Sequence, residues 1–133
     1  MKRHPLSLIV DTTLHTAFTA LYGIFVLTGI IAIFAFPHPL VAVTSREAAL
    51  FWVLGLGVVS ALSLVFSLRE RWGRREMIST SILSALLVIY SASVLIWGLQ
   101  SGHLSGLLVG VFSLSYAVFP LWRVRYLFKR YQK

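Results

Sequence analysis

The chain of 133 residues carries 12 Lys and Arg against 4 Asp and Glu, and it is 58% hydrophobic and only 12% charged. A water-soluble domain has roughly 25% charged residues, so the composition excludes a soluble globular protein and predicts an integral membrane protein. Because the chain contains no cysteine, disulfides and Cys-based metal sites are excluded as well.

Four charge-free apolar intervals are expected to be membrane-spanning helices, at residues 17–36, 48–68, 77–99 and 104–122. Each is about 20 residues long, which at about 1.5 Å per residue covers the roughly 30 Å hydrocarbon core of a bilayer. Strands of a β-barrel would alternate in polarity and would be about half as long. The sequence therefore predicts a single all-α domain, a membrane four-helix bundle built from two helical hairpins.

Residues 5–16 precede the first span and are expected to start its helix at the membrane interface. Asp11 and His15 are four residues apart there, so they are neighbours on a helix, and inside a bilayer they would form a candidate protonation site. Proline ends the first span after Phe36. Counting back about 20 residues places His15 near the inner hydrocarbon boundary and Asp11 one turn further out. A solvated helix start is therefore preferred.

The link after the first span, "PHPLVAVTSRE", predicts a capping box for the second helix, with Thr44 as the N-cap and Glu47 three residues on. The positions of the charges predict the orientation. Of the 12 Lys and Arg residues, only Arg46 lies in this link, and the others lie near the two termini or in the link "RERWGRRE". By the positive-inside rule, we expect both termini on the cytoplasmic side of the cell membrane.

Cations and tryptophans at the span ends are predicted to anchor the bundle at the interfaces and to contact anionic lipid headgroups. These residues are Arg69, Arg71, Arg74, Arg75, Arg123, Arg125, Lys129, Arg130, Trp52, Trp72, Trp97 and Trp122. The basic tail of residues 123–133 alternates cations with aromatic residues. So short a segment beside a bilayer forms no groove for nucleic acid, so anchoring is the preferred interpretation.

Small residues at helical spacing predict close helix packing, because association in lipid depends on the near approach of two backbones. The residues concerned are Gly102, Gly106, Gly110, Ser113 and Ala117 in the fourth span and Gly57 and Ala61 in the second. The spacing alone does not determine which surface these residues contact. This surface belongs to another helix of the same chain, a second copy in a homo-oligomer, or another membrane protein.

The apolar intervals contain no Asp, Glu, Lys or Arg, which argues against an ion-coupled transporter, since such proteins need an ionisable group inside the membrane. Small multidrug transporters are similar in size, but their glutamate in the first helix has no counterpart before Glu47. The sequence has no HExxH motif, no paired carboxylates and no phosphate-binding loop. We therefore expect no enzyme activity, no metal and no cofactor.

The plan of the chain resembles that of small multi-span proteins of tailed phages of actinobacteria, some of which are designated holins. The shared features are the short length, the Ser/Gly/Ala-rich spans, the turn "RERWGRRE" and the tail "RVRYLFKRYQK". The resemblance implies oligomerisation in the cytoplasmic membrane and permeabilisation that releases or activates an endolysin. Two alternatives stay open. One is an accessory subunit or an immunity or exclusion factor in a membrane complex, and the other is a small transporter that depends on Asp11 or His15.

Overall fold

The computed structural model describes the backbone of residues 5–35, 38–69 and 73–131 and, within these ranges, the side chains of residues 12–129. The described residues form helices joined by short links. The helices are α1 (Pro5–Phe34), α2 (His38–Val43), α3 (Arg46–Leu68), α4 (Gly73–Ser101) and α5 (Leu104–Tyr131). The prediction of an all-α chain with four long apolar helices is confirmed.

The four long helices have the length and composition needed to cross a membrane, over Thr12–Phe34, Arg46–Leu68, Gly73–Ser101 and Leu104–Lys129. Each of the four helices extends past at least one end of its charge-free interval. Helix α4 begins before residue 77 and α5 continues past residue 122. Glu76 and Arg123 consequently belong to long helices rather than to flanking loops.

The link between the first two spans differs from its prediction in two ways. Residues 38–43 form the short helix α2, and the N-cap of α3 is Ser45 rather than Thr44. Ser45 has an extended backbone, and its hydroxyl accepts a hydrogen bond of 3.2 Å from the Ala48 N–H. The Thr44 hydroxyl instead donates to the Leu40 carbonyl at 2.6 Å, because it ends α2 rather than starting α3. Glu47 keeps a favourable place in the first turn of α3, near the positive end of the helix dipole.

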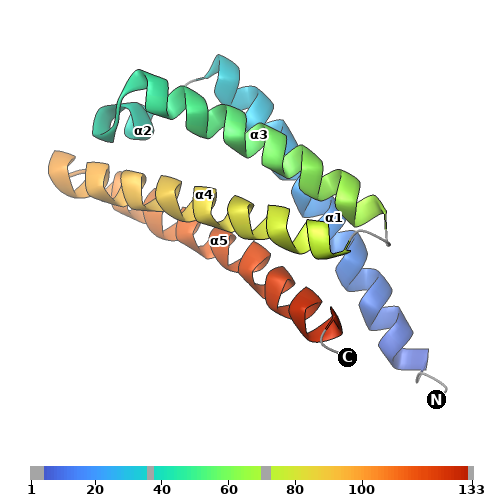
Figure 1. The fold of residues 1–133 in the computed structure, drawn as a ribbon. Coiled ribbons are helices and arrows are strands. Elements are labelled where there is room, and N and C mark those ends of the chain that lie inside the picture. The colour runs from blue at the N-terminus through green and yellow to red at the C-terminus, as the bar shows by residue number, and fades with distance from the viewer. Residues whose placement is uncertain (1–4, 36–37, 70–72, 132–133) are drawn as a thin grey trace.

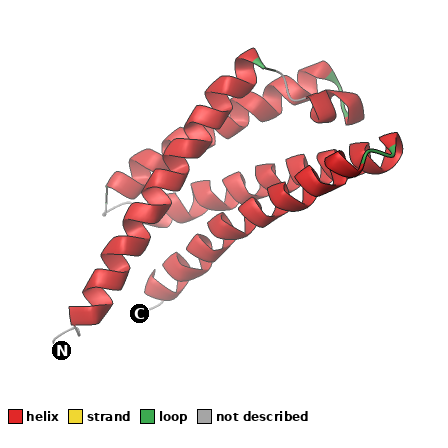
Figure 2. Ribbon diagram, turned by 180° about the vertical axis from the view of Figure 1, so that it is seen from behind, coloured by secondary structure: helices red, strands yellow, loops and turns green. Residues whose placement is uncertain are grey.

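The long helices pair as two hairpins (Figure 1). The first hairpin consists of α1 and α3, with α2 in the link between them. The second consists of α4 and α5, joined by a turn in which Gly102 takes a φ of 66°, which L side chains rarely adopt. The hairpins meet mainly along α3 and α4. The beginning of α1 and the end of α5 lie at the same end of the bundle (Figure 2), which we call the inner end.

Each hairpin contains one very close backbone contact at glycine. A Cβ atom on Gly29 of α1 would lie 2.8 Å from the Cα of Gly57 in α3. A Cβ atom on Gly98 of α4 would lie 2.8 Å from the backbone nitrogen of Leu107 in α5, beside Gly106. Any larger residue at Gly29 or Gly98 would push the helices apart. Close van der Waals contact of this kind holds helices together in lipid.

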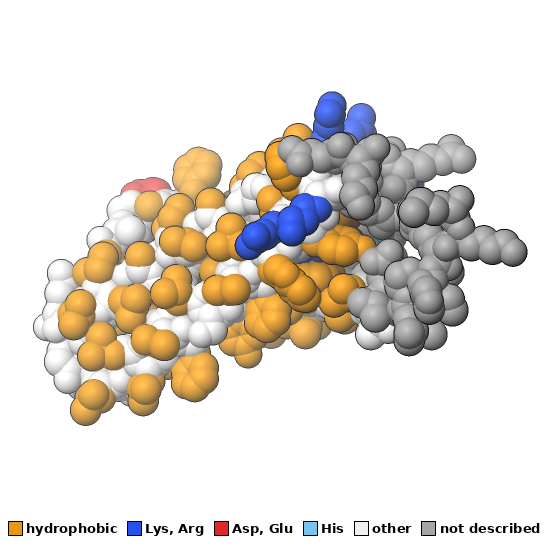
Figure 3. All heavy atoms as spheres, turned by 90° about the horizontal axis from the view of Figure 1, so that it is seen from below, with side chains coloured by type: hydrophobic (Ala, Val, Ile, Leu, Met, Phe, Trp, Pro, Cys, Tyr) orange, Lys and Arg blue, Asp and Glu red, His pale blue; other side chains and the backbone are white. Residues whose placement is uncertain are grey.

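The distribution of polar groups is the reverse of that in a soluble protein. Hydrophobic side chains cover the outer surface of the bundle in Figure 3, and Lys and Arg side chains lie towards one end of it. The interior contains apolar residues together with many polar ones. The buried polar and charged residues are Ser60, Ser63, Ser67, Glu76, Ser79, Thr80, Ser84, Ser91, Ser93 and Arg123.

Candidate functional site

A buried ion pair joins the two helices of the second hairpin near the inner end. Arg123 of α5 donates from Nε to Oε1 of Glu76 in α4 at 2.9 Å, and its Nη2 lies 2.9 Å from the same oxygen as an ion pair. The side chains of Arg123 and Glu76 are only 3% and 4% exposed. Taking two charges out of water is costly, so a buried pair persists only where its geometry is good and further hydrogen bonds satisfy the remaining polar atoms.

Helix α1 supplies those further contacts by covering the ion pair. The Tyr22 hydroxyl lies 2.8 Å from the hydroxyl of Thr80 and 3.4 Å from Oε1 of Glu76. The Arg123 Nη2 lies 3.2 Å from Nδ1 of His15. Since a guanidinium has no acceptor, the Nδ1 atom accepts this bond. We call His15, Tyr22, Glu76, Thr80 and Arg123 the inner cluster.

Aromatic rings complete the cover over the guanidinium. The ring of Phe18 in α1 has its centroid 5.1 Å from the Arg123 Cζ, and the ring of Tyr126 in α5 lies at 5.6 Å. Trp122 approaches Phe18 with a ring separation of 5.9 Å. A cation within about 6 Å of a ring centroid is attracted to the face of the ring. Arg123 is thus held by one carboxylate, one imidazole and two rings.

Two hydroxyl contacts extend the polar interior beyond the inner cluster. Thr19 of α1 lies 2.8 Å from Ser67 of α3 within the first hairpin. Ser63 of α3 donates to Ser79 of α4 at 2.9 Å, from one hairpin to the other. Every buried side-chain nitrogen and oxygen among the described residues has a hydrogen-bond partner. The junction between the hairpins at the inner end is therefore polar and fully hydrogen-bonded.

The chemistry available to this arrangement is that of a structural junction. A carboxylate held by a guanidinium forms a neutral pair, and Oε1 of Glu76 also lies 3.4 Å from the Tyr22 hydroxyl. Among the described side chains no three of His, Asp and Glu come close enough to hold a metal ion.

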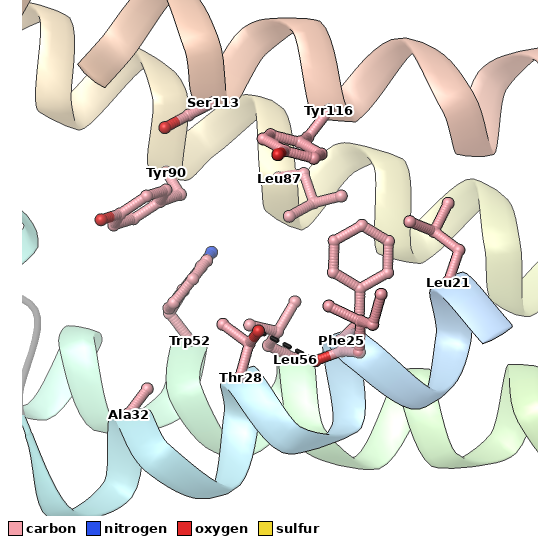
Figure 4. Close-up of a pocket in the computed structure, with 11 residues that line it drawn as sticks. Leu21, Phe25, Thr28, Ala32, Trp52, Leu56, Leu87, Tyr90, Ser113 and Tyr116 are labelled. Carbon is pink, nitrogen blue, oxygen red and sulfur yellow. Dashed lines mark hydrogen bonds between the residues drawn. The ribbon is translucent and has the colours of Figure 1, made fainter.

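A cavity of about 420 Å³ lies beyond the inner cluster, between the two hairpins (Figure 4). It reaches from the level of Leu21 to that of Ala32 along α1, and all four long helices line it. Its wall is almost entirely apolar and aromatic. Trp52 of α3 and Tyr90 of α4 face it as a stacked pair with a ring separation of 4.9 Å. The bundle thus has a polar junction at its inner end and an apolar cavity further along.

The predicted protonation pair is divided by the structure. His15 belongs to the inner cluster, where it contacts Arg123. Asp11 lies in the helical backbone of α1, and its side chain is outside the described residues. The acidic member of the cluster is Glu76, which the sequence analysis does not single out.

The predicted interfacial anchors fall into two groups. Arg69, Arg74, Arg75, Arg125 and Lys129 are exposed at the inner end, and Trp122 is exposed beside them. Arg123 and Trp52 are instead buried. Arg123 faces Glu76, and the Trp52 indole N–H donates to the Leu86 carbonyl at 2.7 Å, so neither serves as an exposed anchor. Trp97 is half-buried, while Arg71, Trp72 and the side chain of Arg130 lie outside the described residues.

Two of the predicted packing residues of the fourth span, Gly106 and Gly110, meet α4 of the same chain. Gly106, Gly110 and Ala117 are buried, and a Cβ atom on Gly110 would lie 2.6 Å from the Leu95 side chain. Ser113 is half-buried and lines the cavity. Gly102 is exposed in the turn and takes no part in the helix contact. In the second span Gly57 meets Gly29, whereas Ala61 is exposed.

One signal in the sequence points to Arg123. The buried face of α5 runs from Gly106 through Gly110, Ala117 and Pro120 to Arg123. Continuing the small-residue face by its helical spacing would have placed this arginine on the inside of the bundle. A span that ends at residue 122 leaves Arg123 outside this buried face.

Comparison of the chain with protein-family models, with curated proteins and with solved structures finds no match. The geometry of the bundle defines a class: a small multi-span membrane protein of four candidate transmembrane helices, arranged as two hairpins.

Proposed function

We propose that the protein is a holin-like protein of the cytoplasmic membrane, which assembles with further copies and makes the membrane permeable. In this proposal both termini face the cytoplasm, and the exposed basic residues at the inner end contact anionic lipid headgroups. The resemblance in plan to small phage membrane proteins supports the proposal from the sequence side. The polar junction between the hairpins supports it from the structural side.

The polar junction is the observation that carries the proposal. A water-filled path through a membrane needs polar side chains on its wall, and this chain keeps such side chains between its hairpins. Ser63, Ser79 and the inner cluster would line a path if the hairpins separated and several copies joined. In the closed monomer they bond to one another instead.

The junction also gives a reason for delayed and cooperative opening. Moving α1 away uncovers Arg123 and Glu76, and ionisable side chains that face lipid instead of protein or water are costly. Separation of the two hairpins is favourable only when water or another copy of the protein takes the place of α1 over Arg123 and Glu76. The monomer is then stable until enough copies are present.

The glycine face of α5 is not the assembly surface in this proposal. Gly106 and Gly110 are occupied by Gly98 and Leu95 of α4. Contacts between copies would form instead through the surfaces that the separated hairpins expose.

A disulfide between the hairpins gives a direct test, because the natural chain has no cysteine. Ser63→Cys together with Ser79→Cys would link α3 to α4, at a site where the two hydroxyls are 2.9 Å apart. The matched control is Thr19→Cys with Ser67→Cys, whose hydroxyls are 2.8 Å apart within the first hairpin. Purified protein in dye-filled vesicles is oxidised and dye release is measured.

We expect oxidation to block dye release by the Ser63/Ser79 variant and a reductant to restore it. The Thr19/Ser67 variant should release dye in both states, since its disulfide leaves the hairpins free to separate. Equal release by both oxidised variants would refute opening between the hairpins. A parent protein that inserts fully yet releases no dye, and whose expression is harmless, would favour an accessory subunit or an immunity factor.

A small transporter is the second candidate, and the location of Glu76 and His15 favours it. The apolar intervals contain no charged residue, but Glu76 precedes one of them within the same candidate span and is buried. A transporter of this kind would carry a solute in the cavity and would lose flux in Glu76→Gln. It would not release a trapped dye.

A further inference from the structure

The apolar cavity between the hairpins has a closed back and an open side. Its back wall comes from α3 and α4, where Trp52 is 8% exposed and Leu56 is buried. Its rim comes from α1 and α5, where Ile24 is 57% exposed and Tyr116 is 55% exposed. Because these rim residues lie in candidate spans, the open side faces the hydrocarbon of the bilayer.

Three polar side chains on the wall, those of Thr28, Ser113 and Trp52, already donate to carbonyls of the protein. Thr28 donates to the Ile24 carbonyl at 2.9 Å, and Ser113 donates to the Val109 carbonyl at 2.7 Å. The Trp52 indole donates to the Leu86 carbonyl. These three groups need no hydrogen bond from an occupant. The rest of the wall is apolar except for the hydroxyls of Tyr90 and Tyr116, so the cavity suits a molecule that is apolar along most of its length.

The dimensions of the cavity favour a flexible chain. Eleven residues of α1 separate Leu21 from Ala32, a distance of about 16 Å along the helix axis. The volume of about 420 Å³ falls in the usual range of roughly 300–1,000 Å³ for ligand sites. The cavity ends at the level of the inner cluster. There the buried side chains of Tyr22 and Phe18 close it, and Phe18 contacts Trp122 of α5.

We propose that the cavity binds one acyl chain of a bilayer phospholipid, which enters sideways between α1 and α5. The bilayer supplies this chemistry at the rim, and an empty apolar space beside fluid hydrocarbon would forfeit the dispersion contacts of its lining. The bound chain packs on the Trp52–Tyr90 stack and separates the middle parts of the two hairpins. This inference does not depend on permeabilisation.

The fluorescence of Trp52 reports on the site, because so small an exposed fraction shields it from the lipid around the protein. We would make a variant of the full chain with Trp72, Trp97 and Trp122 changed to Phe. It would be placed in phosphatidylcholine vesicles with bromine at the middle of the acyl chains. Bromine quenches an indole at van der Waals contact, so we expect fluorescence to fall roughly twofold or more against unbrominated vesicles.

Two matched substitutions on α5 locate the quenching lipid. Ser113→Phe fills the cavity, whereas Ser115→Phe changes an exposed residue that makes the same kind of bond, to the Val111 carbonyl. Quenching of Trp52 should be mostly lost in Ser113→Phe and kept in Ser115→Phe. A second variant retaining Trp122 alone should be quenched in every background, because Trp122 is exposed, and this confirms insertion.

Several outcomes would overturn the proposal. If Trp122 is quenched and Trp52 is not, then water or protein fills the cavity instead of a lipid chain. Equal quenching of Trp52 in Ser113→Phe and Ser115→Phe would place the lipid outside it. Quenching that appears only when the protein is strongly diluted in lipid would show that a second copy is the normal occupant. The comparison of Trp52 with Trp122 needs no cavity-filling variant, so it stands even if Ser113→Phe fails to fold.

Discussion

The guanidinium of Arg123 and the carboxylate of Glu76 are 2.9 Å apart in the interior of the bundle, although the two residues flank opposite ends of the α4–α5 hairpin in sequence. The contact fixes the inner end of α5 against that of α4. The turn at Gly102 fixes their other ends. Helix α1 then packs over the pair through Tyr22 and His15. The ion pair therefore connects the folding of the second hairpin to its junction with the first.

Removing one partner of the pair should destabilise the protein much more than removing both. Arg123→Met leaves the Glu76 carboxylate buried without its partner, and breaking such a pair typically costs about 3–5 kcal/mol. Combining Arg123→Met with Glu76→Leu removes both charges and should recover most of that loss. Unfolding by SDS in mixed micelles measures the three free energies.

The matched control for this cycle is Arg125→Met on the same helix. Arg125 is exposed, so its loss should change the free energy of unfolding by less than about 0.5 kcal/mol. If Arg123→Met and Arg125→Met behaved alike, the ion pair would contribute nothing to folding in the membrane environment.

The Tyr22 hydroxyl makes a smaller contribution that can be measured separately. Tyr22→Phe removes the hydrogen bonds to Thr80 and Glu76 but keeps the ring. Hydrogen bonds between membrane helices average about 0.6 kcal/mol, so we expect a loss of about 1 kcal/mol for the two. Tyr116→Phe, at an exposed position of α5, serves as the control and should be neutral in the same unfolding experiment.

Substitution at Gly106 should act on the monomer. A Cβ atom there would lie 3.0 Å from the Cα of Gly98 and 3.1 Å from the Trp97 ring. Gly106→Ile therefore forces α4 and α5 apart, and overpacking of this kind costs roughly 1–3 kcal/mol. Leu108→Ile changes an exposed side chain of the same helix and should be close to neutral. Equal stability of the two variants would mean that this helix contact is absent in the membrane.

The general architecture was predictable because hydrophobic length alone determines it. Four apolar intervals of about 20 residues leave few alternatives to four helices, and the structure has these helices. The ends were harder to predict. The same criterion ends a span at the first charged residue, whereas an ion pair such as Glu76–Arg123 lets a helix carry charge into the bundle. The pairing of Glu76 with Arg123 depends on two segments of the chain at once, so the sequence of one interval alone does not predict it.

The tryptophans illustrate the same limit. An interfacial position and a buried one look alike in sequence, since both lie near the end of a span. Trp52 is turned inward because Leu86 of α4 offers a carbonyl within reach and Tyr90 offers a ring to stack on. Those partners lie on another helix. Of the small residues predicted to pack closely, Gly57, Gly106 and Gly110 lie at contacts between helices, whereas Gly102 and Ala61 are exposed. Only the structure shows which helix each contact involves.

The orientation of the bundle in the membrane gives the last prediction. The end of α3, the beginning of α4 and the end of α5 lie at the same end of the bundle as the beginning of α1 (Figure 1). These segments carry exposed cations, among them Arg69, Arg74 and Arg125. By the positive-inside rule, segments rich in Lys and Arg lie on the cytoplasmic side of the membrane. Both termini should therefore lie in the cytoplasm. A reporter active only in the periplasm should be silent when fused after residue 133. The same reporter should be active when inserted in the link near His38, and a cytoplasmic reporter should give the opposite pattern at the two sites. Activity of the periplasmic reporter at the C-terminus would refute this orientation, and it would place the inner cluster and the basic residues on the outer side of the membrane.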